Sequence, residues 1–378
     1  MAIVQKGVRL RLIKKLFAAS AIVSLGRNGE FMSNMENFFA VSIRGESHVQ
    51  SGKPMQDYSV AVKNEDICVA VVCDGHGADK HFRSEIGSKL AAEIASEKLC
   101  EFAACYPTWS TVEKSRKALI KRLKLVILTE WQNGVEAYTV ANPFTEEELS
   151  KVSATYKQRC SYDQASPYGT TMLAALICKD YYLLLMIGDG AIIQINPDFT
   201  SNMVVFPGKI ELDDGPHGPT DSMCASDNYR KLFDICEKIE EDNAIAFALC
   251  SDGLSEAFST DKSLMDKLKN YLNFFAEEGM DSAVEAITAQ LNQLTKISWA
   301  QDDISLAFAT RHIEAYDKRE EIEGEPSADS TTEAVPESVS DASSEAESVT
   351  EAEMIVETVT ASVDEGDKSD GSQDAQTE

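Results

Sequence analysis

Hydrophobic residues gather along the chain in short runs rich in β-branched side chains, a pattern typical of buried strands. The run 69–73 is the clearest, and it ends abruptly in Asp74-Gly75-His76-Gly77. Similar runs, several bounded by polar or glycine-containing turns, predict further strands. The predicted strands are 38–43, 58–62, 67–72, 170–178, 181–187, 191–195, 244–250 and 304–310. We expect the three strands between 170 and 195 to form a meander.

Between these runs, apolar residues recur at helical spacing, which predicts helices over 84–102, 112–131, 261–277 and 282–294. Thr145 and Glu148 form a capping-box pattern, so another helix is expected after the break at Asn142-Pro143. Residues 197–243 are expected to be a long irregular insertion with a short helix near 231–239. Long irregular segments in compact domains are often functional, so we expect this one to lie near the site and shape specificity.

The two ends of the chain differ from its middle. Residues 1–35 hold a basic segment and then an apolar stretch too short for a good transmembrane span. A weak signal peptide, a surface anchor and a translation start at Met32 or Met35 are the alternatives, and we favour a leader outside the fold. Residues 314–378 hold 21 acidic and three basic residues, with no aromatic residue after Tyr316. Such a segment is expected to be disordered, which leaves 36–313 as the predicted domain.

Charge and cysteine content exclude several classes of protein. The net charge of −28 comes mostly from the acidic tail and argues against nucleic-acid or anionic-membrane partners. The nine cysteines are odd in number, several lie in apolar runs, and no CxxC pair occurs. Reduced, buried thiols in a cytoplasmic protein fit this usage better than a disulfide framework or a zinc site.

Acidic residues recur where the predicted strands begin or end. Asp74 and Asp252 each follow a buried strand and precede glycine, while Asp57 and Asp302 each come just before a strand. Asp189 sits in a Gly-Asp-Gly turn. Acids at strand ends are often only turn formers, which is the alternative explanation.

A metal site explains this pattern well, because an unpaired buried carboxylate is costly and carboxylates suit hard ions such as Mg²⁺ or Mn²⁺. Two such ions about 3.5–4 Å apart bind a phosphate group and activate water near neutral pH. No phosphate-binding glycine loop is present, which argues against a kinase or nucleotide hydrolase.

Five motifs occur in the order found in metal-dependent serine/threonine protein phosphatases of the 2C type, which the chain therefore resembles over about 38–310. The opening stretch, from Gly45-Glu46-Ser47-His48 to Gln56-Asp57, resembles a bacterial branch of that family. The motifs are Asp74-Gly75-His76-Gly77, Tyr168-Gly169-Thr170-Thr171, Ile187-Gly188-Asp189-Gly190, Ser251-Asp252-Gly253 and Asp302-Asp303-Ile304-Ser305.

The resemblance implies an α+β fold, a four-layer α-β-β-α sandwich of two antiparallel sheets flanked by helices. It also implies two Mn²⁺ or Mg²⁺ ions at one end of the sandwich. Asp74 would bridge both ions and Gly75 would offer its carbonyl oxygen. Asp252 and Asp302 would hold the first ion and Asp57 the second. His76 matches the general acid toward the leaving group, a role that an unperturbed pKa near 6.5 suits.

Two departures from the family pattern concern phosphate and metal binding. The arginine that usually grips the phosphate is replaced by Gly52, and Lys53, His48 and Arg44 are the candidate substitutes. Lysine lacks the bidentate fork of arginine. Asp163 is the nearest acid to the usual third-metal position, so a third ion stays open.

The expected function is hydrolysis of phosphoserine or phosphothreonine on proteins by a metal-activated water, without a phosphoenzyme intermediate. The expected partners are phosphorylated proteins and a serine/threonine kinase system. A catalytically weak pseudophosphatase that acts as a binding or regulatory module is the alternative, because the phosphate-gripping arginine is absent. A metal-dependent nuclease fits the acidic charge less well.

Overall fold

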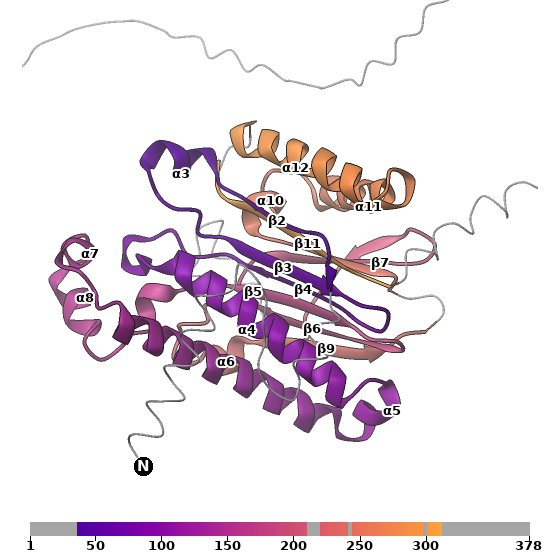
Figure 1. Ribbon diagram of the computed structural model, residues 1–378, viewed down its shortest axis with the longest axis horizontal. Coiled ribbons are helices and arrows are strands. Elements are labelled where there is room, and N and C mark those ends of the chain that lie inside the picture. Colours follow the sequence, from indigo (N-terminus) through magenta and orange to yellow (C-terminus); the bar gives the residue numbers. More distant parts are fainter. Residues whose placement is uncertain (1–35, 210–219, 241–243, 298–300, 312–378) are drawn as a thin grey trace, which may run out of the picture. The chain divides into compact units, whose positions relative to one another are not determined.

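The computed structural model describes residues 36–209, 220–240, 244–297 and 301–311 (Figure 1). By its contacts the chain divides into two compact units, Met1–Glu325 and Pro326–Glu378, and all described residues belong to the first. The predicted leader (1–35) and acidic tail (314–378) lie outside the described residues, so the domain boundaries at 36 and 313 stay predictions.

Two antiparallel sheets form the centre of the first unit, as the resemblance implied (Figure 1). One sheet has six strands in the order β1 (Glu36–Asn37), β3 (Tyr58–Lys63), β4 (Cys68–Cys73), β5 (Met172–Ile177), β6 (Tyr181–Ile187) and β9 (Phe233–Lys238). The other has five, in the order β2 (Ala40–Ile43), β11 (Ile304–Thr310), β10 (Ala246–Cys250), β7 (Ala191–Ile195) and β8 (Ser201–Met203).

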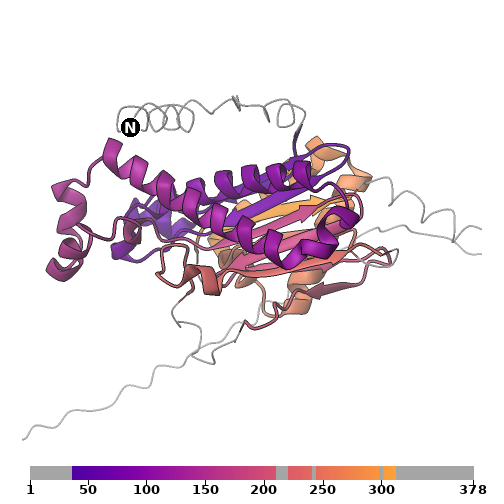
Figure 2. The ribbon, with the colours of Figure 1, turned by 90° about the horizontal axis from the view of Figure 1, so that it is seen from below.

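Long helices cover the outer face of each sheet, so the expected four-layer α-β-β-α sandwich is confirmed. Helices α4 (Ser84–Cys105) and α6 (Arg116–Ala141) run side by side across the six-stranded sheet (Figure 2). Helices α11 (Asp261–Glu277) and α12 (Met280–Ile297) cover the five-stranded sheet (Figure 1). The shorter helices are α3 (Glu46–Ser51), α5 (Trp109–Val112), α7 (Glu146–Ser150), α8 (Ala154–Arg159), α9 (Asn228–Lys231) and α10 (Asp252–Ser255), with 3-10 turns η1 (Asp79–His81), η2 (Glu113–Ser115) and η3 (Ser166–Tyr168).

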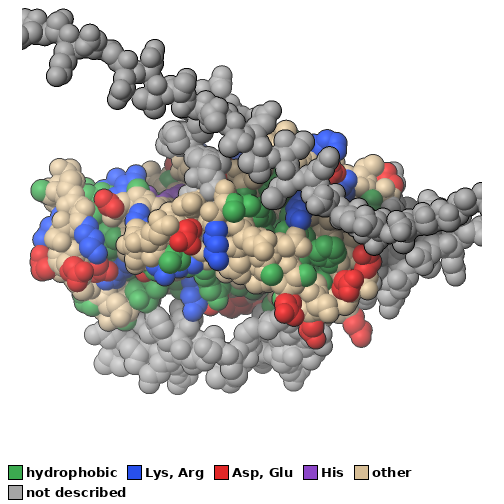
Figure 3. Space-filling view, turned by 90° about the horizontal axis from the view of Figure 1, so that it is seen from above, with side chains coloured by type: hydrophobic (Ala, Val, Ile, Leu, Met, Phe, Trp, Pro, Cys, Tyr) green, Lys and Arg blue, Asp and Glu red, His purple; other side chains and the backbone are tan. Residues whose placement is uncertain are grey.

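The surface of the described residues is mixed in character. On the face shown in Figure 3, acidic and basic side chains are interspersed, with hydrophobic side chains in small groups among them. Of the helices in the described part of the chain, none combines the length and the apolar character needed to cross a membrane.

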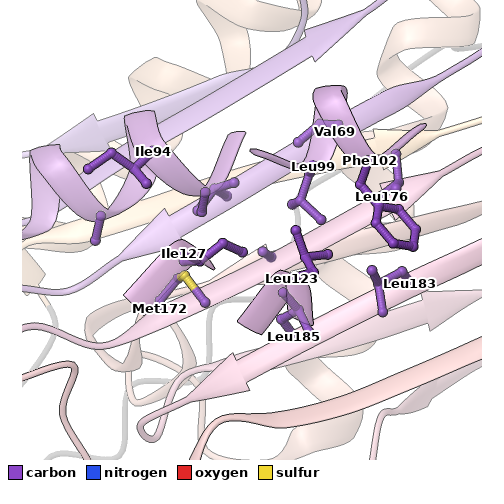
Figure 4. Close-up of a cluster of buried hydrophobic side chains, with 14 of the residues drawn as sticks. Val69, Ile94, Leu99, Phe102, Leu123, Ile127, Met172, Leu176, Leu183 and Leu185 are labelled. Atoms are coloured by element: carbon purple, nitrogen blue, oxygen red, sulfur yellow. The ribbon is translucent and has the colours of Figure 1, made fainter. Parts of the chain in front are cut away.

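Strand β4 shows why the chain forms layers. Its side chains alternate between two cores: Val69 and Val71 pack toward α4 and α6, while Ala70 and Val72 pack between the two sheets. A strand buried on both faces needs a continuous apolar run, which is what the sequence has at this point. Figure 4 shows the outer core, where Ile94, Leu99 and Phe102 of α4 meet side chains of the six-stranded sheet.

Two sequence predictions about strand arrangement are wrong. The meander over 170–195 does not form, because β7 leaves the sheet of β5 and β6 and pairs with β10 and β8. The change of sheet occurs at Gly188, whose φ of +112° favours glycine. The helix expected near 231–239 is instead the edge strand β9, which pairs with β6. The insertion 197–243 is therefore less irregular than predicted, since it holds β8, α9 and β9.

The segment that carries α7 and α8 is held at its base by Arg83, just before α4. Arg83 Nε and Nη2 donate to Glu148 at 2.7 and 2.9 Å, and Nη1 donates to the Asn142 carbonyl and the Tyr168 hydroxyl at 2.7 and 2.8 Å. The predicted capping box is confirmed, with Glu148 also accepting from the backbone N–H of Thr145. One carboxylate therefore starts α7 and ties it to the core.

Candidate active site

The four acids singled out in the sequence converge because of the way the strands pair. Tyr58 at the start of β3 faces Cys73 at the end of β4, so Asp57 and Asp74 lie at the same edge of their sheet. In the other sheet, β10 ends beside the start of β11, which brings Asp252 and Asp302 to a common edge. All four acids line one cavity of about 460 Å³, together with Asp189 and Asp303.

The loop after β4 is fixed by the Gly-Thr-Thr stretch. The backbone N–H of Asp74 donates to Thr171 Oγ1 at 2.9 Å, and its carbonyl accepts from Thr171 N and Thr170 Oγ1, each at 2.8 Å. A Cβ on Gly75 would lie 2.5 Å from the Gln56 carbonyl oxygen, so no side chain fits at that position. A Cβ on Gly77 would meet nothing closer than 3.7 Å, so close packing does not require glycine there.

The site concentrates negative charge that the fold leaves uncompensated. Burial and the carboxylates of Asp57 and Asp252 raise the pKa of Asp74 well above its ordinary value. Burial and the carboxylate of Asp303 raise the pKa of Asp57 well above its ordinary value. Burial also raises the pKa of Asp252 and Asp302. Asp302 faces the cavity, so half of its side-chain surface is reached by water although protein surrounds it.

The chemistry of these residues fits hard divalent cations. Asp57 Oδ2 is buried and has no hydrogen-bond partner among the described residues, which is costly without a cation. The remaining donors are carboxylates, the oxygen ligands that Mg²⁺ and Mn²⁺ prefer. A bound cation would also remove the repulsion that raises the carboxyl pKa values.

The sequence did not point to Asp303, which organises one wall of the cavity. Its Oδ1 accepts from the backbone N–H of Gly45 at 2.7 Å, and its Oδ2 accepts from that of Gln56 at 2.6 Å. His48 Nδ1 lies 3.0 Å from Asp303 Oδ1, and His48 Nε2 lies 3.4 Å from Asp302 Oδ1. Although burial alone would raise it, these contacts lower the pKa of Asp303. The doubled acid in Asp302-Asp303 was the only available signal.

His48 is the one candidate phosphate contact that lines the cavity, but it already faces two carboxylates. The nearby carboxylate of Asp303 raises the pKa of His48, against the effect of burial. Arg44 Nη2 instead donates to the carbonyls of His48, at 2.8 Å, and Lys53. Lys53 Nζ donates to the Gly77 carbonyl at 3.0 Å. Phosphate binding by these three residues stays a prediction, and two of them are occupied with backbone oxygens.

His76 lines the cavity as expected, but the expected unperturbed pKa is wrong. Burial, with a smaller effect of Lys80, lowers the pKa of His76 to about 4. Its ring lies 4.9 Å from that of His81, whose pKa burial also lowers to about 4. Both imidazoles are therefore neutral near pH 7 in the protein alone.

The remaining acids have different surroundings. Asp189 lines the cavity and accepts a hydrogen bond from Thr220 Oγ1 at 2.5 Å. Asp163 does not line it, and its carboxylate instead accepts from Arg159 Nε at 2.8 Å and from the backbone N–H of Ser166 at 3.2 Å. Asp189 is thus better placed than Asp163 to reach a cation in this cavity.

Comparison with solved structures finds matches to bacterial phosphatases. A bacterial serine phosphatase matches at 17% identity and TM-score 0.46, covering 74% of this chain and 98% of that one. Stp1 from Staphylococcus aureus matches at 16% identity and TM-score 0.45, covering 73% of this chain and 94% of that one. The catalytic domain of PstP, solved with two manganese ions, matches at 16% identity and TM-score 0.43, covering 73% of this chain and 97% of that one.

Comparison of the sequence itself gives two results. No curated protein matches this chain. A family model described as protein phosphatase 2C matches residues 44–293, which is more than half of the chain and includes three of the four converging acids. The chain therefore belongs to the protein phosphatase 2C family of metal-dependent protein serine/threonine phosphatases.

Proposed function

We propose that this chain is an active phosphatase that hydrolyses phosphoserine or phosphothreonine on proteins, with two Mn²⁺ or Mg²⁺ ions held by Asp57, Asp74, Asp252 and Asp302. The observation that carries the proposal is the convergence of these four carboxylates at one cavity. The Gly75 carbonyl is a further candidate ligand. Phosphorylated proteins, made by a serine/threonine kinase system in the cytoplasm, are the proposed substrates.

The chemistry divides between the ions and the chain. When bound, the two ions would neutralise the phosphate oxygens and lower the pKa of water to near 7. The chain's carboxylates would fix where the ions sit, and so where the phosphate binds, and the loop held by Thr170 and Thr171 keeps Asp74 in place. Such preorganisation is the main contribution a protein makes to phosphoryl transfer.

His76 is proposed to hold the proton for the departing serine or threonine oxygen. Its pKa of about 4 is too low for a general acid near pH 7. A phosphate dianion beside the imidazole would raise that pKa, because a nearby negative charge favours the protonated form. The residue would then be charged only when substrate is bound.

A metal-dependent assay tests the proposal. An aryl phosphate and a phosphoserine peptide should be hydrolysed with Mn²⁺, and a chelator should abolish turnover. Asp74→Asn and Asp252→Asn should each lower kcat by more than about a hundredfold, the scale expected when electrostatic stabilisation of a transition state is lost. Asp66→Ala, an exposed acid in a hairpin turn, is the control and should leave kcat unchanged. Equal activity in all variants would refute the proposed site.

The pseudophosphatase alternative rests on one observation, that Arg44 donates to backbone carbonyls instead of lining the cavity. Calorimetric titration with Mn²⁺ alongside turnover separates the two functions. Binding of two ions with turnover supports the enzyme. Binding of ions without turnover of any phosphoester supports a regulatory module.

A further inference from the structure

The cavity has a second side that the metal-binding acids do not use. Lys80 from η1 and Arg159 from α8 are the two Lys or Arg residues among its described lining residues. Both are exposed, whereas Asp57 is buried. The Lys80 and Arg159 side chains therefore lie on the solvent side of the cavity, where the rest of a bound protein substrate would continue beyond its phosphate group.

Arg159 is oriented by its own helix and by a neighbouring acid. Its Nε and Nη2 lie 2.8 and 2.7 Å from one oxygen of Asp163, while Nη1 has no hydrogen-bond partner among the described residues. Tyr156, three residues earlier and on the same helical face, also lines the cavity, and its hydroxyl lies 2.5 Å from Ser166 Oγ. Helix α8 thus presents one face to the cavity.

Lys80 has no ion pair within the described part of the chain. It directly precedes His81 in η1, and the His81 ring lies 4.9 Å from that of His76. Ser166 links His81 to α8, because its carbonyl oxygen lies 2.6 Å from His81 Nδ1 and its hydroxyl lies 2.5 Å from that of Tyr156. The two cations therefore lie on the histidine side of the cavity, which is the side of the leaving group under the proposed function. The carboxylates that would hold the metal ions lie at the sheet edges.

We propose that Lys80 and Arg159 form a cationic rim that selects phosphoserine or phosphothreonine peptides with acidic groups next to the phosphorylated residue. The inference rests on the proposed function and adds a substrate class to it. The ions held by the acidic residues would bind the scissile phosphate. The rim would bind a neighbouring carboxylate or second phosphate of the same peptide. Because the chain outside its tail is also acidic, local cations are needed to attract such a peptide.

The test compares four substrates: an aryl phosphate and three phosphoserine peptides of equal length with acidic, neutral or basic neighbours. For the wild type with Mn²⁺, kcat/KM should be highest for the acidic peptide, and the preference should shrink as salt is raised. Lys80→Ala and Arg159→Ala should each lower kcat/KM for the acidic peptide roughly two- to fivefold, the range of exposed ion pairs. The aryl phosphate should change by less than about twofold.

Charge reversal supplies a gain that damage to the fold cannot imitate. The double variant Lys80→Glu/Arg159→Glu should prefer the basic peptide over the acidic one. Lys262→Glu on α11, which reverses one charge outside the cavity lining, is the control and should keep the wild-type order.

Other outcomes separate the alternatives. Equal losses on every substrate, the aryl phosphate included, would mean that the cations grip the scissile phosphate, which overturns the rim. No preference among the peptides would overturn it too. If the wild type hydrolyses nothing, the proposed function fails, and the rim is then judged by fluorescence anisotropy with non-hydrolysable phosphonate peptides: tighter binding of the acidic peptide supports it, and equal binding refutes it.

Discussion

Replacing Asp303 by asparagine should destabilise the fold, while the same change at its neighbour Asp302 should not. Asp303 is buried and accepts two short backbone hydrogen bonds, from Gly45 at 2.7 Å and Gln56 at 2.6 Å. Asparagine keeps the shape but has one oxygen, so its NH₂ group would face one of these N–H groups. Asp302 is half exposed, and its bond from the Asp303 N–H, at 2.8 Å, is one that asparagine keeps.

The magnitude follows from those contacts. A buried donor left without a partner costs about 1–3 kcal/mol, and the remaining bond loses about 1 kcal/mol when its acceptor is no longer charged. Asp303→Asn should therefore lower the free energy of unfolding by about 2–4 kcal/mol. In a domain of this size that corresponds to a fall in Tm of roughly 3–7 °C. Asp302→Asn should change it by less than about 1 kcal/mol.

Thermal unfolding in the presence of a chelator measures both variants without any contribution from bound metal. The two substitutions remove the same charge from adjacent positions, so each controls for the other. Manganese binding should be weakened most in Asp302→Asn, if that residue is a ligand. Equal Tm values for Asp303→Asn and the wild type would refute the bracing role of Asp303. An equal fall in both variants would show that the effect is one of charge alone.

Three further predictions concern the frame around the site. Gly87→Ala should cost about 1–3 kcal/mol or prevent folding, because its Cβ would lie 2.0 Å from the Tyr168 carbonyl oxygen, whereas Gly134→Ala, with no contact below 3.5 Å, should stabilise by up to about 1 kcal/mol in chemical denaturation. Arg83→Met should cost about 2–3 kcal/mol, because it removes a buried guanidinium and leaves the partly exposed Glu148 without its partner. It should also speed amide hydrogen exchange over 142–168, while Arg83→Lys should be intermediate. Burial would raise the pKa of Glu148, but hydrogen bonds from Arg83 lower it. The stabilisation by these hydrogen bonds should therefore be complete above pH 4.5 and fade as pH falls through the lowered pKa. Glu148→Gln should remove this pH dependence, measured by hydrogen exchange at several pH values.

The parts of the site that the sequence predicted are those that depend on local pattern and simple pairing. Asp74 and Asp252 end continuous apolar runs, and antiparallel neighbours return such ends to one edge of a sheet. Strand β7 was found for the same reason. The sheet to which β7 belongs was not predicted, because an apolar run buried on both faces carries no information about which strand it pairs with.

The parts that the sequence missed depend on contacts between distant residues. Strand β9 has only one buried residue, Cys236, so its alternation of apolar and polar residues is weak and does not distinguish a strand from a helix. Asp303 meets Gly45 across more than 250 positions, and no local spacing reveals that contact. The lowered pKa of His76 follows from burial, which only the folded structure supplies.

The pairing of β2 with β11 has a consequence for when the site can form during synthesis. Ile43 lies beside Ile304, and the Ser42 and Ser305 hydroxyls are 2.6 Å apart. The strand of the five-stranded sheet that is synthesised first therefore pairs with the strand that is synthesised last. Asp302 and Asp303 precede that last strand directly. A nascent polypeptide still attached to the ribosome before these residues emerge has neither the brace at Gly45 nor the full carboxylate set. Under the proposed function, metal binding would therefore wait until translation of the domain is nearly finished, and an incomplete chain would not act on phosphoproteins.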